Sequence, residues 1–70
     1  MAKLTAPEFL SKRTTERMEK LGLNKTQVQI RSGLGLMTVR RVIEGKADLR
    51  LSTLAKLAEA LEAKPSEMVP

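Results

Sequence analysis

Two adjacent arginines, Arg40 and Arg41, are the residues of this chain best suited to chemistry with a charged partner. They lie on the polar face of an amphipathic helical pattern over residues 36–44. Consecutive residues of a helix point about 100° apart, so the two guanidinium groups extend in different directions. An exposed cationic helix fits the major groove of DNA, which is wide enough to admit an α-helix. The pattern therefore predicts a helix that faces DNA.

Such a helix needs apolar residues on its opposite side to fix it against the domain. Val39 and Val42 recur at helical spacing within residues 36–44, and we expect both to point into the core. Gly45 is expected to end this helix. The residues left outside are Met37, Arg40, Arg41 and Glu44.

A second short helix is predicted directly before it, over residues 25–32. Asn24 is a favourable N-cap for this helix. Gly33 follows it and is expected to adopt the left-handed conformation that glycine tolerates. Leu34 is expected to fill the core between the two helices, and Gly35 to cap the next one. Residues 24–45 are thus predicted to be two helices joined by a tight turn.

The rest of the chain also has helical periodicity. A first helix is predicted over residues 8–21, with Pro7 in its first turn and Gly22 at its end. A fourth is predicted over residues 51–63, capped by Ser52 or Asp48, and Pro65 opens a final turn from which Met68 packs back onto the core. Residues 1–6 and 70 are expected to be flexible. The apolar stripe of the fourth helix is Leu51, Leu54, Leu57, Ala58 and Leu61.

The predicted fold class is all-α, a compact four- to five-helix bundle with a single domain over residues 1–70. Hydrophobic residues make up 41% of the sequence and charged residues 30%, as in ordinary globular chains. Cysteine and histidine are both absent, which argues against thiolate metal sites and against an enzyme with ordinary acid–base chemistry. We therefore expect no cofactor and no metal. No apolar run has the length of a membrane span, so no membrane association is expected.

Positive charge is concentrated in one region. The net charge is +5, and residues 12–50 hold ten lysines and arginines against four acidic residues, a local balance of +6. Residues 51–70 carry two lysines and three glutamates, a balance of −1. This distribution is typical of a surface that faces a polyanion, although a solvated basic face gives the same pattern.

The segment around these helices resembles the helix-turn-helix of the lambda-repressor/Cro-like (Xre-type) DNA-binding family. Gly33 and Leu34 match the turn glycine of the family and the apolar residue after it. Residues 38–45, TVRRVIEG, are similar to the end of its recognition helix, and residues 51–68, LSTLAKLAEALEAKPSEM, to its next helix and closing turn. The likeness covers roughly residues 8–69. It differs from the family pattern at Lys25, Gln29 and Ile43, where glutamine, alanine and glutamate are usual.

The resemblance implies a set of DNA-facing positions. Arg40 and Arg41 are each suited to a bidentate contact with guanine, and we expect one to read a base while the other holds a phosphate. For Leu36 a place in the core, and for Lys46 a solvated loop charge, remain open alternatives. The base-edge candidates are Leu36, Met37, Arg40 and Arg41. The phosphate candidates are Asn24, Lys25, Thr38 and Lys46.

Two functions of different class follow. The first is a sequence-specific transcriptional regulator in the cytoplasm, resembling a minimal Cro-type repressor that binds a pseudo-palindromic operator as a homodimer. Its dimer contact is expected on the fourth helix or on residues 64–70, where Met68 and Val69 offer apolar area. The alternative is an interaction module such as an antitoxin, whose main partner is a protein toxin. RNA binding has little support, because Phe9 is the sole aromatic residue.

Overall fold

The computed structural model describes residues 6–47 and 49–69, and these are all helix, turn or loop. Ala6, assigned to the flexible tail from sequence, is the N-cap of the first helix, and Pro7 is its first residue. The rest of the predicted flexible ends, and Asp48, lie outside the described residues. The helices are α1 (Pro7–Leu21), α2 (Lys25–Ser32), α3 (Leu36–Ile43), α4 (Leu51–Ala60) and the 3₁₀ turn η1 (Pro65–Glu67).

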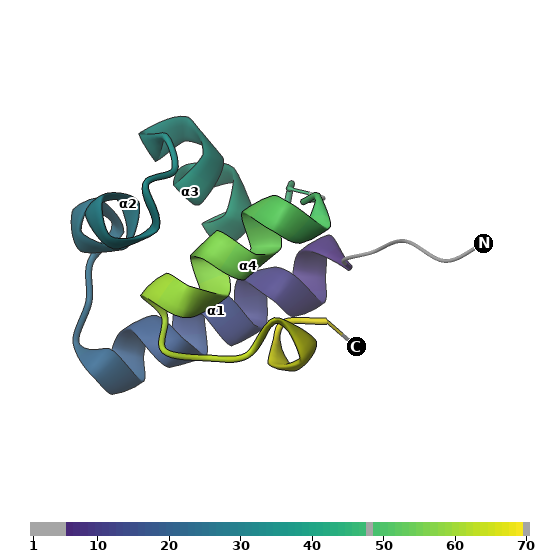
Figure 1. Cartoon of the computed structure of the whole chain (residues 1–70), viewed down its shortest axis with the longest axis horizontal. Coiled ribbons are helices and arrows are strands. Elements are labelled where there is room, and N and C mark those ends of the chain that lie inside the picture. Colours follow the sequence, from purple (N-terminus) through teal and green to yellow (C-terminus); the bar gives the residue numbers. More distant parts are fainter. Residues whose placement is uncertain (1–5, 48, 70) are drawn as a thin grey trace.

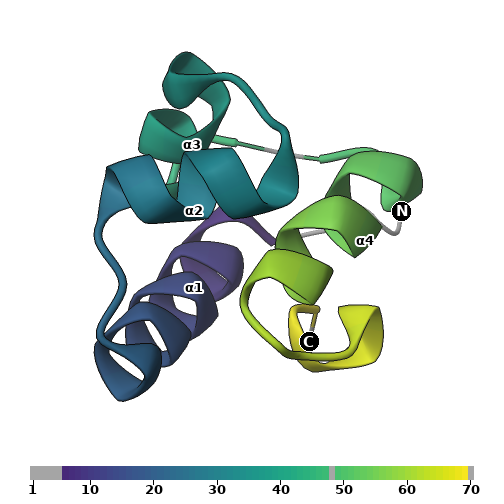
Figure 2. The same cartoon turned by 60° about the vertical axis from the view of Figure 1, so that its left-hand side comes forward.

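The helices surround one apolar interior. α3 packs against α1 and α2, while α2 also packs against α4, and η1 packs against α4. Figure 1 shows α3 at the top and α2 at the left, with α4 and α1 below α3, and the turned view in Figure 2 shows α3 above α2 and α2 above α1. The fully buried large side chains come from every helix except η1, which is followed directly by one of them, Met68. The apolar ones are Leu10, Val28, Val39, Val42, Leu54, Leu57, Leu61 and Met68, and Thr14 is buried with them.

Glycines end α1 and α2 as predicted. Gly22 and Gly33 both have left-handed backbone angles, with φ of 69° and 72°. Their N–H groups donate to carbonyls of the last helical turn, Gly22 to Glu19 and Gly33 to Gln29. A side chain at either position would be strained, because L residues rarely adopt this region.

The fourth helix is shorter than predicted. It ends at Ala60 rather than at residue 63, because Leu61 leaves the helical conformation and Glu62 has a φ of 55°. The expected cap at Ser52 is also wrong, since the N-cap is Arg50 and, among the described residues, no side chain caps the helix there. Leu51 is 59% exposed and does not join the buried stripe, because it is the first residue of the helix and lies outside the core cluster.

The closing turn packs inward. Met68 is completely buried, which confirms that it returns to the core. The same burial makes it unavailable to a second subunit, so the expectation that Met68 offers apolar area for dimerisation is wrong. Val69 is half-buried and packs against the core cluster.

Candidate nucleic-acid interface

The turn between α2 and α3 is held by short-range hydrogen bonds. The buried Ser32 hydroxyl donates to the Gln29 carbonyl at 3.4 Å and accepts from the Leu34 N–H at 3.2 Å. Leu34 is half-buried against the core cluster, as predicted. Gly35 is the N-cap of α3, in an extended conformation. The direction in which α3 leaves the turn is therefore fixed by both polar and apolar contacts.

α3 is strongly amphipathic. Val39 and Val42 are 0% and 1% exposed, as the sequence predicts. On the other side Met37 is 64% exposed, and Arg40 and Arg41 are also exposed. The two apolar valine side chains anchor the helix, and the opposite face with Met37, Arg40 and Arg41 is exposed to solvent.

The other two candidates on α3, Leu36 and Thr38, differ in exposure. Leu36 is 46% exposed, so the alternative that it belongs to the core is wrong. Thr38 is half-buried. α3 thus carries Leu36, Met37, Thr38, Arg40 and Arg41 on one short helix.

Arg40 and Arg41 have different surroundings, in agreement with their separation around the helix. Arg40 Nε lies 3.9 Å from Glu44 Oε2, one turn along α3. Arg41 lines a surface hollow of about 260 Å³ together with Thr38, Ala47 and Leu49. Of its lining residues Ala47 and Leu49 are buried, and Thr38 and Arg41 supply a hydroxyl and a cation.

Three candidates lie outside α3. The Asn24 side chain accepts from the Gln27 N–H at 2.8 Å, and the Gln27 side chain accepts from the Asn24 N–H at 2.8 Å. This reciprocal pair is a capping box, so Asn24 acts as the cap predicted from sequence. Lys25 is exposed as the first residue of α2. Lys46 follows α3, and its Nζ lies 3.8 Å from Glu44 Oε1.

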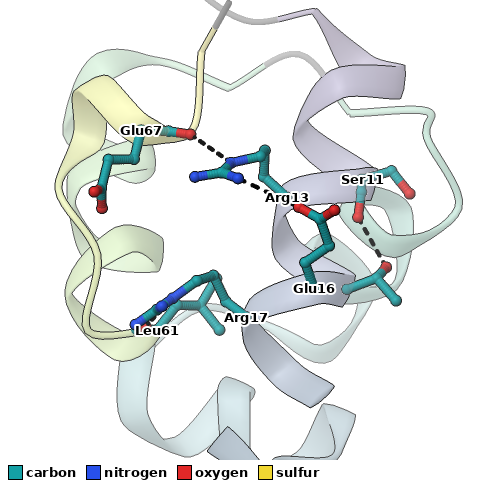
Figure 3. Close-up of polar contacts among 7 residues, drawn as sticks. Ser11, Arg13, Glu16, Arg17, Leu61 and Glu67 are labelled. Atoms are coloured by element: carbon teal, nitrogen blue, oxygen red, sulfur yellow. Dashed lines mark hydrogen bonds and ion pairs between the residues drawn. The ribbon is translucent and has the colours of Figure 1, made fainter. Parts of the chain in front are cut away.

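Three arginines of the basic segment have structural partners that the sequence did not indicate. Arg13 Nε donates to the Glu67 carbonyl at 2.9 Å (Figure 3). Arg17 donates to the Leu61 and Glu62 carbonyls at 3.1 and 3.0 Å. Arg31 donates to the Ala60 carbonyl at 3.3 Å.

These bonds join α1 and α2 to the end of α4 and the segment after it. All their acceptors are backbone carbonyls at or beyond the last helical residue, where such groups lack helical partners. The charge of residues 12–50 is therefore not one continuous surface. Arg13 and Arg17 bind the closing turn and the segment before it. The cations on α3 and next to it form the candidate interface.

Two helices at a glycine turn, with the second presenting a cationic arc, form a helix-turn-helix of the kind that enters the major groove. The profile of the Cro/C1-type HTH DNA-binding domain family matches residues 15–69. The chain belongs to this family, and its resemblance to lambda-repressor/Cro-like proteins is confirmed. No curated protein and no solved structure gives a significant match. Within residues 6–47 and 49–69, no helix has the length and apolar character needed to cross a bilayer.

Proposed function

We propose that this protein is a sequence-specific transcriptional repressor that inserts α3 into the major groove of its operator. The observation that supports the proposal is the exposed cationic face of α3. Arg40 and Arg41 are exposed on a helix whose opposite side is anchored by fully buried Val39 and Val42. A rigid helix with exposed guanidinium groups is well suited to base readout in the major groove.

The proposed contacts divide into two kinds. Arg40, Arg41, Met37 and Leu36 face the base edges, where an arginine reads guanine and an apolar group touches the methyl of thymine. Thr38 flanks them on α3. Contacts to phosphate set the register of the protein without reading the sequence. The proposed phosphate contacts are Asn24, Lys25, Thr38 and Lys46.

We also propose that the repressor binds as a homodimer on a pseudo-palindromic site. One module of this class reads few base pairs, and two modules separated by about 34 Å read two half-sites. Leu51, 59% exposed at the start of α4, supplies apolar area for the subunit contact. Leu51→Glu should then give monomers in analytical ultracentrifugation and keep the helical circular dichroism spectrum. Dimers that persist in this variant would place the contact elsewhere.

The deciding experiment measures binding to random-sequence duplex DNA at two salt concentrations. A protein that neutralises phosphates loses affinity steeply as salt rises, because counterions are released on binding. Site selection from a random duplex library then supplies the operator, and two-fold symmetric sites would support the dimer. Weak binding without salt dependence would contradict the proposal and favour a protein partner such as a toxin.

A further inference from the structure

Three charged side chains meet at the C-terminal end of α3. The two carboxylate oxygens of Glu44 face different cations, with Oε2 3.9 Å from Arg40 Nε and Oε1 3.8 Å from Lys46 Nζ. The side chains are 45% exposed for Glu44, 56% for Arg40 and 71% for Lys46. All three are thus accessible to a ligand that approaches this end of the helix.

Glu44 differs from the other paired acids of the described residues in where its partners lie. Glu16 pairs with Arg13 on α1, and Glu62, just after α4, pairs with Arg31 on α2. Arg13 and Arg31 also donate to the backbone carbonyls of Glu67 and Ala60, so the partners of these acids make contacts between helices. The partners of Glu44, in contrast, are both proposed DNA contacts.

We propose that Glu44 is a specificity-determining residue, which competes with DNA phosphates for Arg40 and Lys46. This inference rests on the proposed function. Non-specific binding depends on cation–phosphate contacts alone, so a carboxylate that occupies two of the cations weakens it directly. The same carboxylate also adds repulsion toward the phosphates.

Glu44 weakens binding to the operator less than it weakens binding to random sequence. The Arg40–Glu44 pair has the i,i+4 spacing at which helical side chains are neighbours, so it favours guanidinium orientations along α3. An arginine held in this way loses less side-chain freedom when it meets a base edge. Glu44 therefore lowers affinity for random sequence more than affinity for the operator, and this difference is specificity.

The test compares three variants on a random-sequence duplex and on the site selected from a library. Glu44→Gln removes the charge, Glu44→Asp keeps the charge but shortens the side chain, and Glu16→Gln makes the same change in net charge on α1. Exposed pairs are weak, so we expect Glu44→Gln to tighten random-duplex binding by about three- to tenfold. The slope of log affinity against log salt should steepen by about one to two units, because Arg40 and Lys46 are then available to neutralise phosphates.

The controls separate pairing from overall charge. Glu16→Gln should change the affinity and the slope much less than Glu44→Gln does, and Glu44→Asp should give an intermediate effect. The ratio of operator to random affinity should fall in Glu44→Gln. The inference is overturned if Glu44→Gln behaves like Glu16→Gln, or if Glu44→Asp matches the wild type. A wild type without salt-dependent duplex binding would remove the proposed function, and this inference with it. Thermal melting of each variant checks that the fold is intact.

Discussion

The Ser11 hydroxyl on α1 donates a hydrogen bond to the backbone carbonyl of Ile43, the last residue of α3 (Figure 3). Carbonyls in the last turn of a helix have no partner within the helix, so this bond satisfies one of them from a neighbouring helix. It joins the first helix of the chain to the end of the helix that carries Arg40 and Arg41. The position of the candidate interface is therefore tied to α1 as well as to the turn before it.

Ser11→Ala should destabilise the protein. Loss of a part-buried hydrogen bond costs about 1 kcal/mol, and the better helix propensity of alanine offsets about half of that loss. We expect the free energy of unfolding in urea to fall by several tenths of a kcal/mol. Ser52→Ala on α4 is the control, because that serine is also helical but is exposed. Equal stability of the two variants would show that the Ser11–Ile43 bond contributes nothing.

Arg40→Ala and Arg41→Ala should each weaken operator binding and leave the fold unchanged. A good bidentate contact to guanine is worth about 1–3 kcal/mol, which corresponds to roughly five- to 150-fold in affinity. Both side chains are exposed, so melting temperatures should stay within the error of the wild type. Lys20→Ala, an exposed cation at the end of α1, controls for the lost charge. If both arginine variants bind the operator as tightly as Lys20→Ala does, α3 is not the reading helix.

Glu62→Gly should stabilise the protein. Glu62 has a φ of 55°, and a side chain in this left-handed region costs about 1 kcal/mol more than glycine. The lost pair with Arg31, at 3.3 Å and exposed, offsets a small part of this gain. Glu62→Ala loses the same carboxylate but keeps the Cβ atom, so it should be less stable than Glu62→Gly by about 1 kcal/mol. Denaturation of both variants measures this difference, and its absence would show that the backbone is not strained.

Acid should weaken the closing turn through Glu67. The backbone N–H of Lys64 donates to the Glu67 carboxylate at 2.9 Å and, with the charges of Arg17, Arg13 and Lys64 nearby, lowers the pKa of Glu67 below its ordinary value. A group whose pKa is lowered in the folded state adds stability above its unfolded pKa, and this stability is lost as the pH falls through the folded value. Stability should therefore decline as the pH falls below the ordinary pKa of a glutamate and through the lowered pKa of Glu67. Glu67→Gln should show less of this decline, as measured by denaturation at several pH values. An identical pH profile for the variant would exclude Glu67 as a contributor.

Local sequence signals predicted most of the helical framework. Asn24 and Gly33 bound α2 at the expected residues, because a capping box and a left-handed glycine depend only on neighbouring residues. Val39 and Val42 were assigned to the core by spacing alone, and the structure buries them. The predictions failed at the end of α4, where Glu62 adopts a conformation that its residue type does not favour.

The helices, the glycine turn and the exposed face of α3 could therefore be predicted from residue types and spacing, since each follows from interactions within a few residues. Which side chains stay exposed and which find partners elsewhere in the domain, in contrast, depends on tertiary packing. Arg13 is bound to a carbonyl 54 residues away, Met68 is buried, and Leu51 is exposed. These outcomes depend on how helices distant in the chain pack together, because packing sets which carbonyls lack partners and which side chains water can still reach.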